Sequence, residues 1–189
     1  MPTLPIINRR TLRNQRQRLS TLQRQLYAVR VAVATQTKIP SNHTAASYAS
    51  IAPEVSTHYL HKLLIRKGIT VLLPIIQTGN TLAFIPWNKG RQYKNAYGIQ
   101  EPRFTRSRQR QLRSINTILV PLVGFDQQCQ RIGMGGGYYD RLLAKQHSAK
   151  TFGLAFQQQQ LRHIQPQPWD QALHGVITPR RQFTRLRQK

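Results

Sequence analysis

The sequence predicts a single α/β domain over residues 1–189, in which a layered, mostly parallel sheet is flanked by helices. Short apolar runs bounded by turn residues alternate with amphipathic helical segments, and this order is typical of such sheets. The run at residues 117–125 is apolar without alternation, as expected of a strand buried on both faces. A chain of 189 residues is also long enough to bury a core within one domain.

The N-terminal segment, residues 9–30, is predicted to be helical. Its apolar residues recur at spacings of three, four and seven, and they form one stripe on a basic rod: Leu12, Leu19, Leu22, Leu26 and Val29. Ser20 is a residue type that caps helices, so a second helix beginning there would divide the segment in two. Residues 35–44 are polar and contain Pro40, which predicts a loop before a short strand at residues 45–49.

The remaining elements follow the same alternation. Residues 57–67 are predicted to form a helix that ends at Gly68. Runs of β-prone residues lie at 70–76, 81–85, 117–125, 151–156 and 175–178. Residues 86–116 are predicted to be a long basic loop, which in a compact domain is more often functional than idle. From about residue 180 the chain is a basic tail that we expect to be frayed.

The charge of the chain is strongly unbalanced, because 29 Lys and Arg residues face only five Asp and Glu residues, for a net charge of +24. Such a charge attracts polyanions, and nucleic acid is the obvious one. The basic residues are scattered and no base-reading motif accompanies them. Two interpretations therefore stay open: a basic solvated surface in which Gln replaces Glu, and a surface that binds polyanions.

Several functions and locations are disfavoured by composition. No apolar run approaches the length of a membrane span, so we expect no membrane partner. The N-terminus lacks the apolar stretch of a secretory signal. Cys129 is the only cysteine, which excludes an internal disulfide and is consistent with a reducing compartment. We therefore expect a cytoplasmic protein.

The scarce acids fall inside short motifs. They are Glu54, Glu101, Asp126, Asp140 and Asp170. Asp126 and Asp140 flank the densest motif of the sequence, the glycine loop at residues 133–137. Because acidic residues are so rare in this chain, we expect that the acid at each end of the glycine loop is needed for function.

The glycine loop has the features of an anion-binding site. It follows a buried strand and precedes a helical pattern at residues 138–145, and its glycines let backbone N–H groups approach an anion closely. The helix N-terminus adds partial positive charge, and Arg131 and Arg141 add full charges. Asp140 is suited to Mg²⁺ bound with a nucleotide. The alternative is a tight turn with a helix-capping Asp, and the loop is not a Walker A motif.

At these residues the sequence resembles a known family. The blocks at residues 119–126 and 131–141 are similar to the signature of the 5-formyltetrahydrofolate cyclo-ligases, also called methenyltetrahydrofolate synthetases. Weaker similarities follow in order along nearly the whole chain, at residues 9–13, 54–57, 98–102, 169–170 and 176–179.

The resemblance implies a reaction. Members of this family spend ATP to activate the 5-formyl oxygen of 5-formyltetrahydrofolate as an iminium phosphate. The N10 nitrogen then attacks, phosphate leaves, and 5,10-methenyltetrahydrofolate forms together with ADP. The fold that the resemblance implies is a layered α/β sheet, in agreement with the periodicity of the sequence.

The resemblance also implies site residues. Arg131 and Asp140 would be catalytic, and Asp140 would hold Mg²⁺. Glu54 would bind the pterin and Tyr97 would stack on the folate. The residues implied for ATP are Arg9, Arg13, Arg131, Gly133, Gly135, Gly136, Gly137 and Tyr138. We expect Asp170, in the Trp169–Asp170 element, to affect stability more than rate.

Three features depart from the family pattern. Tyr97 stands where some members have Trp. Cys129 stands where the family commonly has Gly, so the turn before Arg131 is expected to differ. The +24 charge is larger than ATP and folate need, although it could help to hold a polyglutamylated folate tail. We therefore expect weak, nonspecific nucleic-acid binding beside the small-molecule substrates. The alternative function is a basic nucleic-acid-binding protein on the same scaffold with decayed catalysis.

Overall fold

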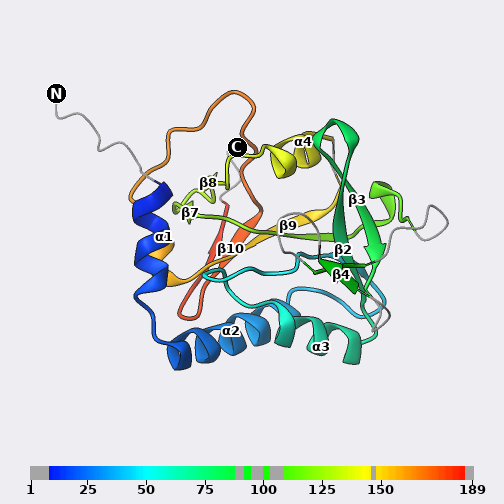
Figure 1. Ribbon diagram of the computed structural model, residues 1–189, viewed down its shortest axis with the longest axis horizontal. Coiled ribbons are helices and arrows are strands. Elements are labelled where there is room, and N and C mark those ends of the chain that lie inside the picture. The colour runs from blue at the N-terminus through cyan, green and yellow to red at the C-terminus, as the bar shows by residue number, and fades with distance from the viewer. Residues whose placement is uncertain (1–8, 88–91, 95–99, 103–108, 146–147, 186–189) are drawn as a thin grey trace.

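The computed structural model describes residues 9–87, 92–94, 100–102, 109–145 and 148–185 (Figure 1). They form a single α/β domain around one seven-stranded sheet, in the order β11-β10-β9-β6-β1-β2-β3. The strands of this sheet are β1 (Thr44–Ala46), β2 (Thr70–Gln77), β3 (Thr81–Pro86), β6 (Thr117–Val120), β9 (Lys150–Leu154), β10 (Gly175–Ile177) and β11 (Gln182–Thr184). The five inner strands are parallel, and β3 and β11 run antiparallel at the two edges. The predicted fold class is confirmed.

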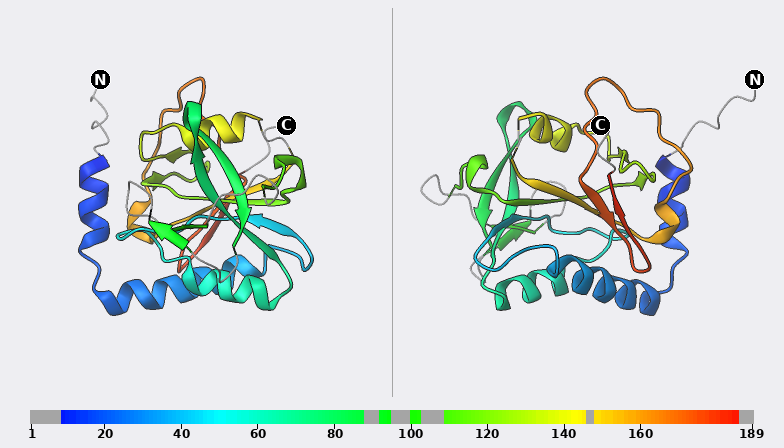
Figure 2. Two further views of the ribbon diagram at one scale, coloured as in Figure 1. Left: turned by 45° about the vertical axis from the view of Figure 1, so that its right-hand side comes forward. Right: turned by 180° about the vertical axis from the view of Figure 1, so that it is seen from behind.

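Four α-helices lie within the described residues: α1 (Arg9–Gln17), α2 (Thr21–Gln36), α3 (His58–Arg66) and α4 (Tyr138–Lys145). Helices α2 and α3 lie along one face of the sheet, α4 lies on the opposite side, and α1 stands at one end (Figures 1 and 2). Neighbouring strand residues point to opposite faces, so Ala45 packs in the core under α2 and α3 whereas Ala46 packs in the core under α4. None of the helices described is long and apolar enough to cross a membrane.

The predicted N-terminal helix is divided at Ser20, which caps α2. The Ser20 hydroxyl accepts from the Gln23 backbone N–H at 3.1 Å, and the Gln23 side chain accepts from the Ser20 N–H at 3.0 Å. The division changes which residues are buried. Leu12 and Leu19 belong to the core, but the continuation of the predicted stripe on α2, at Leu22, Leu26 and Val29, is exposed. The buried face of α2 consists of small residues instead: Ala28, Val31, Ala32 and Thr35.

The sequence predicts a single strand over the apolar run at residues 117–125, but the structure divides this run into two strands. Strand β6 ends at Val120, because Pro121 has no N–H to continue the ladder. The chain then forms β7 (Gly124–Phe125), which pairs with β8 (Arg131–Ile132) in a separate antiparallel ribbon. The turn of this ribbon brings Arg131 and the glycine loop back toward the sheet.

Two further predictions need correction. The stretch at residues 86–116 is not only loop, because β4 (Gln92–Lys94) and β5 (Gln100–Pro102) pair antiparallel within it. The tail from residue 180 is not frayed over its described part. Strand β11 pairs with β10, and the Thr178 hydroxyl accepts from the Arg181 N–H at 3.0 Å. Backbone hydrogen bonds to the sheet edge therefore fix this basic segment.

The sheet has a topological switch point between β1 and β6. From β1 the chain passes through α3 to β2 and β3 on one side, whereas β6, β9, β10 and β11 extend to the other side. In open α/β sheets, ligands bind outside the carboxyl ends of the strands at such a point. Tyr48 and Pro121, which follow β1 and β6, line a cavity at this place.

Candidate active site

Two cavities meet at the glycine loop. The larger is a cleft of about 1490 Å³ between the loop and residues 161–171. The smaller has about 300 Å³ and lies over the carboxyl ends of the strands. Both are lined by Arg131, Asp140 and the loop glycines Gly133, Gly135 and Gly137. The loop and the Arg131–Asp140 pair therefore form the boundary between two compartments.

Two loop glycines are required by the backbone conformation. Gly135 has φ +102°, which side chains other than hydrogen rarely allow. Gly137 has φ +65°, and a Cβ built there would lie 2.7 Å from the Nη1 atom of Arg141. The loop consequently leads into the N-terminus of α4, and its glycines leave the backbone at the cavity wall uncovered by side chains. This arrangement is suited to an anion approaching the N–H groups.

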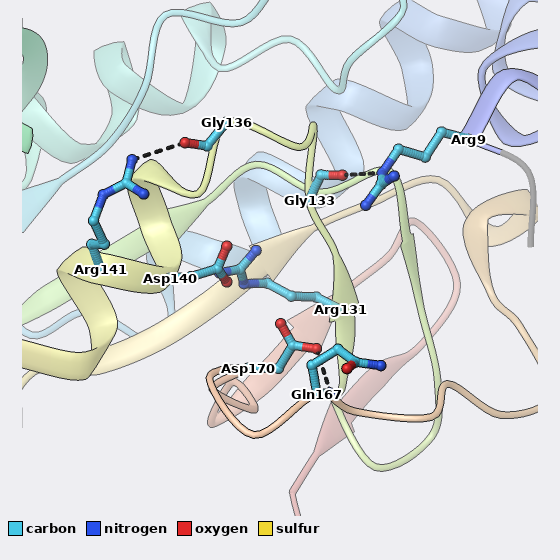
Figure 3. A network of polar contacts seen from close by, with 8 residues as sticks. All are labelled: Arg9, Arg131, Gly133, Gly136, Asp140, Arg141, Gln167 and Asp170. Atoms are coloured by element: carbon cyan, nitrogen blue, oxygen red, sulfur yellow. Dashed lines mark hydrogen bonds and ion pairs between the residues drawn. The ribbon is translucent and has the colours of Figure 1, made fainter. Parts of the chain in front are cut away.

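Two arginines brace the loop through its carbonyl groups (Figure 3). The Arg9 Nε atom donates to the Gly133 carbonyl at 3.1 Å. The Arg141 Nη2 atom donates to the Gly136 carbonyl at 2.8 Å and to the Asn80 carbonyl, in the β2–β3 turn, at 3.0 Å. These contacts join α1 and the β2–β3 turn to the loop. Arg141 is thereby engaged as a structural brace, a role that its place in the sequence does not indicate.

Arg131 and Asp140 form an ion pair between β8 and the first turn of α4 (Figure 3). The Arg131 side chain is 4% exposed and that of Asp140 is 26% exposed. The Arg131 Nε atom is buried and has no partner among the described residues. A buried guanidinium with an unused donor at the wall of a cleft favours an incoming anion.

Asp170 is a second acid of the larger cleft, which the sequence does not predict. Its Oδ2 atom accepts from the Gln167 N–H at 2.8 Å, and this contact shapes the local turn. The residue also lines the cleft together with Asp140, and its carboxylate points toward the Arg131–Asp140 pair (Figure 3). The rarity of acidic residues in the sequence could have identified Asp170 as a candidate site residue, because it applies to Asp170 as much as to Asp126 and Asp140.

Asp126 is a structural anchor beneath the same cleft. It is fully buried, and its Oδ1 atom accepts from the backbone N–H groups of Gln128 and Gln130, each at 3.0 Å. Its Oδ2 atom accepts from the Ile164 N–H at 3.0 Å. One carboxylate therefore joins the β7–β8 turn to the segment that forms the far wall of the cleft.

Glu54 lies in the smaller cavity, whose walls are mostly apolar. Its Oε2 atom accepts from the Ile51 N–H at 2.9 Å. Burial raises the pKa of the Glu54 carboxyl, and the Ile51 N–H and the Arg16 guanidinium oppose that rise. Arg16 is itself buried, and its Nε and Nη1 atoms have no partner in the described part of the chain. The smaller cavity thus offers one carboxylate that is supported by a cation behind it.

Tyr139 completes the wall between Glu54 and Arg131. Its hydroxyl is buried without a partner among the described residues, and it lines the smaller cavity. Burial, followed by the nearby Glu54 charge, raises the pKa of Tyr139, so the phenol stays neutral and can donate. Two other residues from the resemblance are less directly placed. Arg13 is exposed and is not among the described residues that line either cavity, and Tyr97 lies outside the described residues.

Tyr138 is placed at the smaller cavity, and its hydroxyl donates to the Asn80 side chain at 3.4 Å. The Arg141 guanidinium lies 5.6 Å from the centre of the Tyr138 ring. The residues gathered at the boundary are therefore Arg9, Arg131, Gly133, Gly135, Gly136, Gly137, Tyr138 and Asp140, with Glu54 at the far end of the smaller cavity.

The fold and the two cavities define a class of protein: a single-domain α/β protein with a glycine loop, a buried arginine and an acid at the switch point of a parallel sheet. Comparison with known proteins narrows the class. Residues 7–179 match the model of the 5-formyltetrahydrofolate cyclo-ligase family, and the chain belongs to this family of enzymes. The resemblance found in the sequence is confirmed.

Individual relatives agree with this assignment. A 5-formyltetrahydrofolate cyclo-ligase of Escherichia coli is 32% identical over 175 residues, which cover 89% of this chain and 96% of the relative. One of Haemophilus influenzae is 34% identical over 138 residues, covering 70% and 73%. The NMR structure of Aquifex aeolicus 5,10-methenyltetrahydrofolate synthetase matches with a TM-score of 0.81 at 24% identity, over 96% of this chain and 92% of that one. The structural match supports the fold.

Proposed function

We propose that this enzyme cyclises 5-formyltetrahydrofolate to 5,10-methenyltetrahydrofolate at the expense of Mg·ATP, releasing ADP and phosphate. The observation that carries the proposal is the boundary between the cavities. One glycine loop, one buried arginine and one acid face a large cleft on one side and a small, mostly apolar cavity on the other. ATP would occupy the cleft and the pterin the smaller cavity, so that the two reacting groups meet at the loop.

The nucleotide phosphates would lie against the glycine loop. Backbone N–H groups and the N-terminus of α4 favour negative charge there. Arg131 offers its unpartnered Nε donor, and Arg9 lines the same cleft. Arg13, one turn further along α1, stays a prediction for the same role. Trp169 is 65% exposed at the cleft, where its ring offers a face for a nucleotide base.

Asp140 and Asp170 would hold Mg²⁺. Both are carboxylates on one cleft, and hard oxygen donors of this kind, together with phosphate oxygens, are what Mg²⁺ prefers. The residues present therefore fit the metal. When bound, Mg²⁺ would neutralise charge on the phosphates during transfer. Asp140 would keep one oxygen on Arg131 and offer the other to the metal.

The folate would be oriented by Glu54 and Tyr139. The apolar walls of the smaller cavity suit a flat ring, and the Glu54 carboxylate can accept from the N–H groups of a pterin. The Tyr139 hydroxyl lies between Glu54 and Arg131. It can donate a hydrogen bond to the formyl oxygen of the substrate. Tyr97 stays a prediction for stacking. In this orientation the formyl group faces the glycine loop.

The reaction then needs positioning more than covalent help from the protein. The formyl oxygen attacks the γ-phosphorus of ATP, and the bond to the ADP oxygen breaks. The N10 nitrogen next attacks the formyl carbon, the carbon–oxygen bond breaks, phosphate leaves and the N10 proton goes to solvent. Holding both substrates at one boundary supplies the proximity, and Arg131 with the loop N–H groups stabilises the charge that shifts onto the phosphoryl oxygens.

Turnover is expected only when 5-formyltetrahydrofolate, ATP and Mg²⁺ are present together. The methenyl product absorbs in the near ultraviolet where the substrate does not, so its appearance is measured directly. Omission of each component in turn is the control. The absence of any absorbance gain from folded protein with all three components would contradict the proposal.

Nucleic-acid binding is expected to be weak and independent of sequence. The motivation is the +24 charge without any base-reading motif. Binding of this kind is driven by counterion release, so affinity measured by fluorescence anisotropy should collapse as salt increases. A tight, sequence-selective complex at physiological salt would instead support the alternative function of a nucleic-acid-binding protein.

Cys129→Ser is expected to leave turnover within a few-fold of wild type. Cys129 is buried at the β7–β8 turn, and burial raises the pKa of its thiol to about 11, which makes it a poor nucleophile. Its φ of +61° suits glycine, so Cys129→Gly is a matched variant. This variant relieves the backbone strain at residue 129 but removes the buried side chain. Initial rates and thermal unfolding separate the two effects. Loss of turnover in a folded Ser variant would show that the thiol takes part in the chemistry.

A further inference from the structure

The outer face of α2 carries an apolar stripe that neither the core nor the active site uses. It consists of Leu22, Leu26, Val29 and Val33, residues that are 75%, 48%, 38% and 45% exposed. Their spacing of four, three and four residues is that of the a and d positions of a coiled coil. Helix α2 lies along one face of the sheet (Figures 1 and 2). Its buried residues, Ala28, Val31, Ala32 and Thr35, lie on the side of the helix opposite the stripe, which is exposed. The stripe is about 16 Å long, from the rise of an α-helix.

The stripe is narrow. At 3.6 residues per turn its four positions fall within about 60° around the helix axis. Exposed polar residues border it on both sides: Gln25 on one, and Gln23 and Arg30 on the other. Helices that lie in a membrane surface carry a wider apolar face with bulky aromatic residues. A narrow seam with polar borders is instead suited to one packed helix.

The positive charge of the surface around the stripe favours an acidic partner. Residues 9–53 and 55–100 contain no Asp or Glu, so neither α2 nor α3 carries a carboxylate. Helix α3 packs beside α2 and turns Lys62 and Arg66 outward, opposite its buried Leu60 and Leu64. A second copy of this chain would bring the same cations against one another, with no acid to oppose them. An acidic surface would meet them favourably.

We propose that the seam of Leu22, Leu26, Val29 and Val33 on α2 docks an amphipathic helix of a partner protein, with apolar a and d positions and acidic flanks. The apolar seam would supply the contact area, and Arg30, Lys62 and Arg66 would pair with the acidic flanks. This interaction uses a face opposite to α4 and is independent of the proposed reaction. It gives a use to part of the +24 charge that ATP and folate do not need.

The experiment uses the full chain and two synthetic 21-residue helical peptides, a length of about six turns. Both have Leu at a and d, and they carry either Glu or Lys at e and g. Fluorescence anisotropy should show binding of the Glu peptide only, with affinity falling as salt rises. The double variant Leu26→Gln, Val29→Gln should weaken that binding about tenfold or more, while its circular dichroism, unfolding temperature and turnover stay those of wild type.

Four outcomes would overturn the proposal. Equal binding of the Lys peptide would show that the basic surface does not select an acidic partner. Undiminished binding of the Glu peptide by the folded double variant would show that the seam is not the binding site. Sedimentation that shows a dimer of the wild type, dissolved by the double variant, would make a second copy the occupant. Binding to phosphatidylserine vesicles that the variant loses, without binding of the Glu peptide, would make a lipid surface the occupant.

Discussion

Asp140→Asn is expected to lower kcat by roughly a hundredfold or more, the size of effect seen when one preorganised charge or donor is removed from a transition state. Asn keeps the size of the side chain and an oxygen that can still accept from Arg131. It removes the charge that would hold Mg²⁺ against the ATP phosphates, and this chain has few acids to replace it. The measurement is the rate of methenyl product formation over a range of Mg²⁺ concentrations. Raised Mg²⁺ should restore part of the rate if the variant binds the metal more weakly.

The ion pair adds a cost in stability. The Arg131 guanidinium is 4% exposed and would face a neutral amide in the variant, so we expect a loss of about 1–2 kcal/mol of unfolding free energy. Asp170→Asn is the matched comparison, because Asp170 lines the same cleft but is not the ion-pair partner of Arg131. The sequence predicts that Asp170 affects stability more than rate. Because Asp170 lines the cleft, we expect instead that Asp170→Asn raises the Mg²⁺ requirement, with a smaller loss of rate than Asp140→Asn. Near-normal kinetics for Asp140→Asn, with stability alone reduced, would show that Asp140 serves only the ion pair.

Asp126→Ala is expected to be the most destabilising single substitution near the site. It would leave three backbone N–H groups, those of Gln128, Gln130 and Ile164, without their buried acceptor. The combined loss should be about 3–5 kcal/mol, since each unsatisfied buried donor costs about 1–3 kcal/mol and some regain water. For a chain of this size that lowers the unfolding temperature by roughly 10 °C. Thermal and urea unfolding measure both quantities.

The Asn variant of the same residue separates charge from shape. Asp126→Asn keeps one acceptor oxygen for the Gln128 and Gln130 N–H groups but turns an amide donor toward the Ile164 N–H. Its stability should lie between wild type and the Ala variant, and its Michaelis constant for ATP should rise because Ile164 lies in the far wall of the cleft. An Ala variant within about 1 kcal/mol of wild type would mean that the carboxylate does not anchor that wall.

Local patterns were enough to predict the architecture and the glycine loop at which the two cavities meet. Apolar β-prone runs between helices predict a layered parallel sheet, because the side-chain period of each element is set by its own backbone geometry. The glycine loop before α4 was predictable for the same reason, since a bare backbone before a helix N-terminus is a local anion-binding arrangement. The acids at the ends of that loop, Asp126 and Asp140, were identified by their scarcity alone.

The separate roles of those acids depended on contacts between distant parts of the chain. Asp126 accepts from Ile164, 38 residues away, and so proves to be an anchor, whereas Asp140 faces both cavities. Arg9 reaches the Gly133 carbonyl across 124 residues, and Arg141 reaches Asn80 across 61. The periodicity of the sequence does not predict contacts between residues so far apart in the chain. Asp126 also holds Ile164, which lies in the segment that leads to Asp170 at the cleft.

The exposed seam of α2 shows the same division. The sequence alone determined that α2 is a helix with a stripe of Leu and Val, because a period of 3.6 residues is a property of the helix itself. Whether that stripe or the opposite face is buried depends on the direction in which the chain leaves Ser20. The small side chains of Ala28, Val31 and Ala32 let the helix approach the sheet closely, so tertiary packing buried them and left Leu22 and Leu26 in solvent.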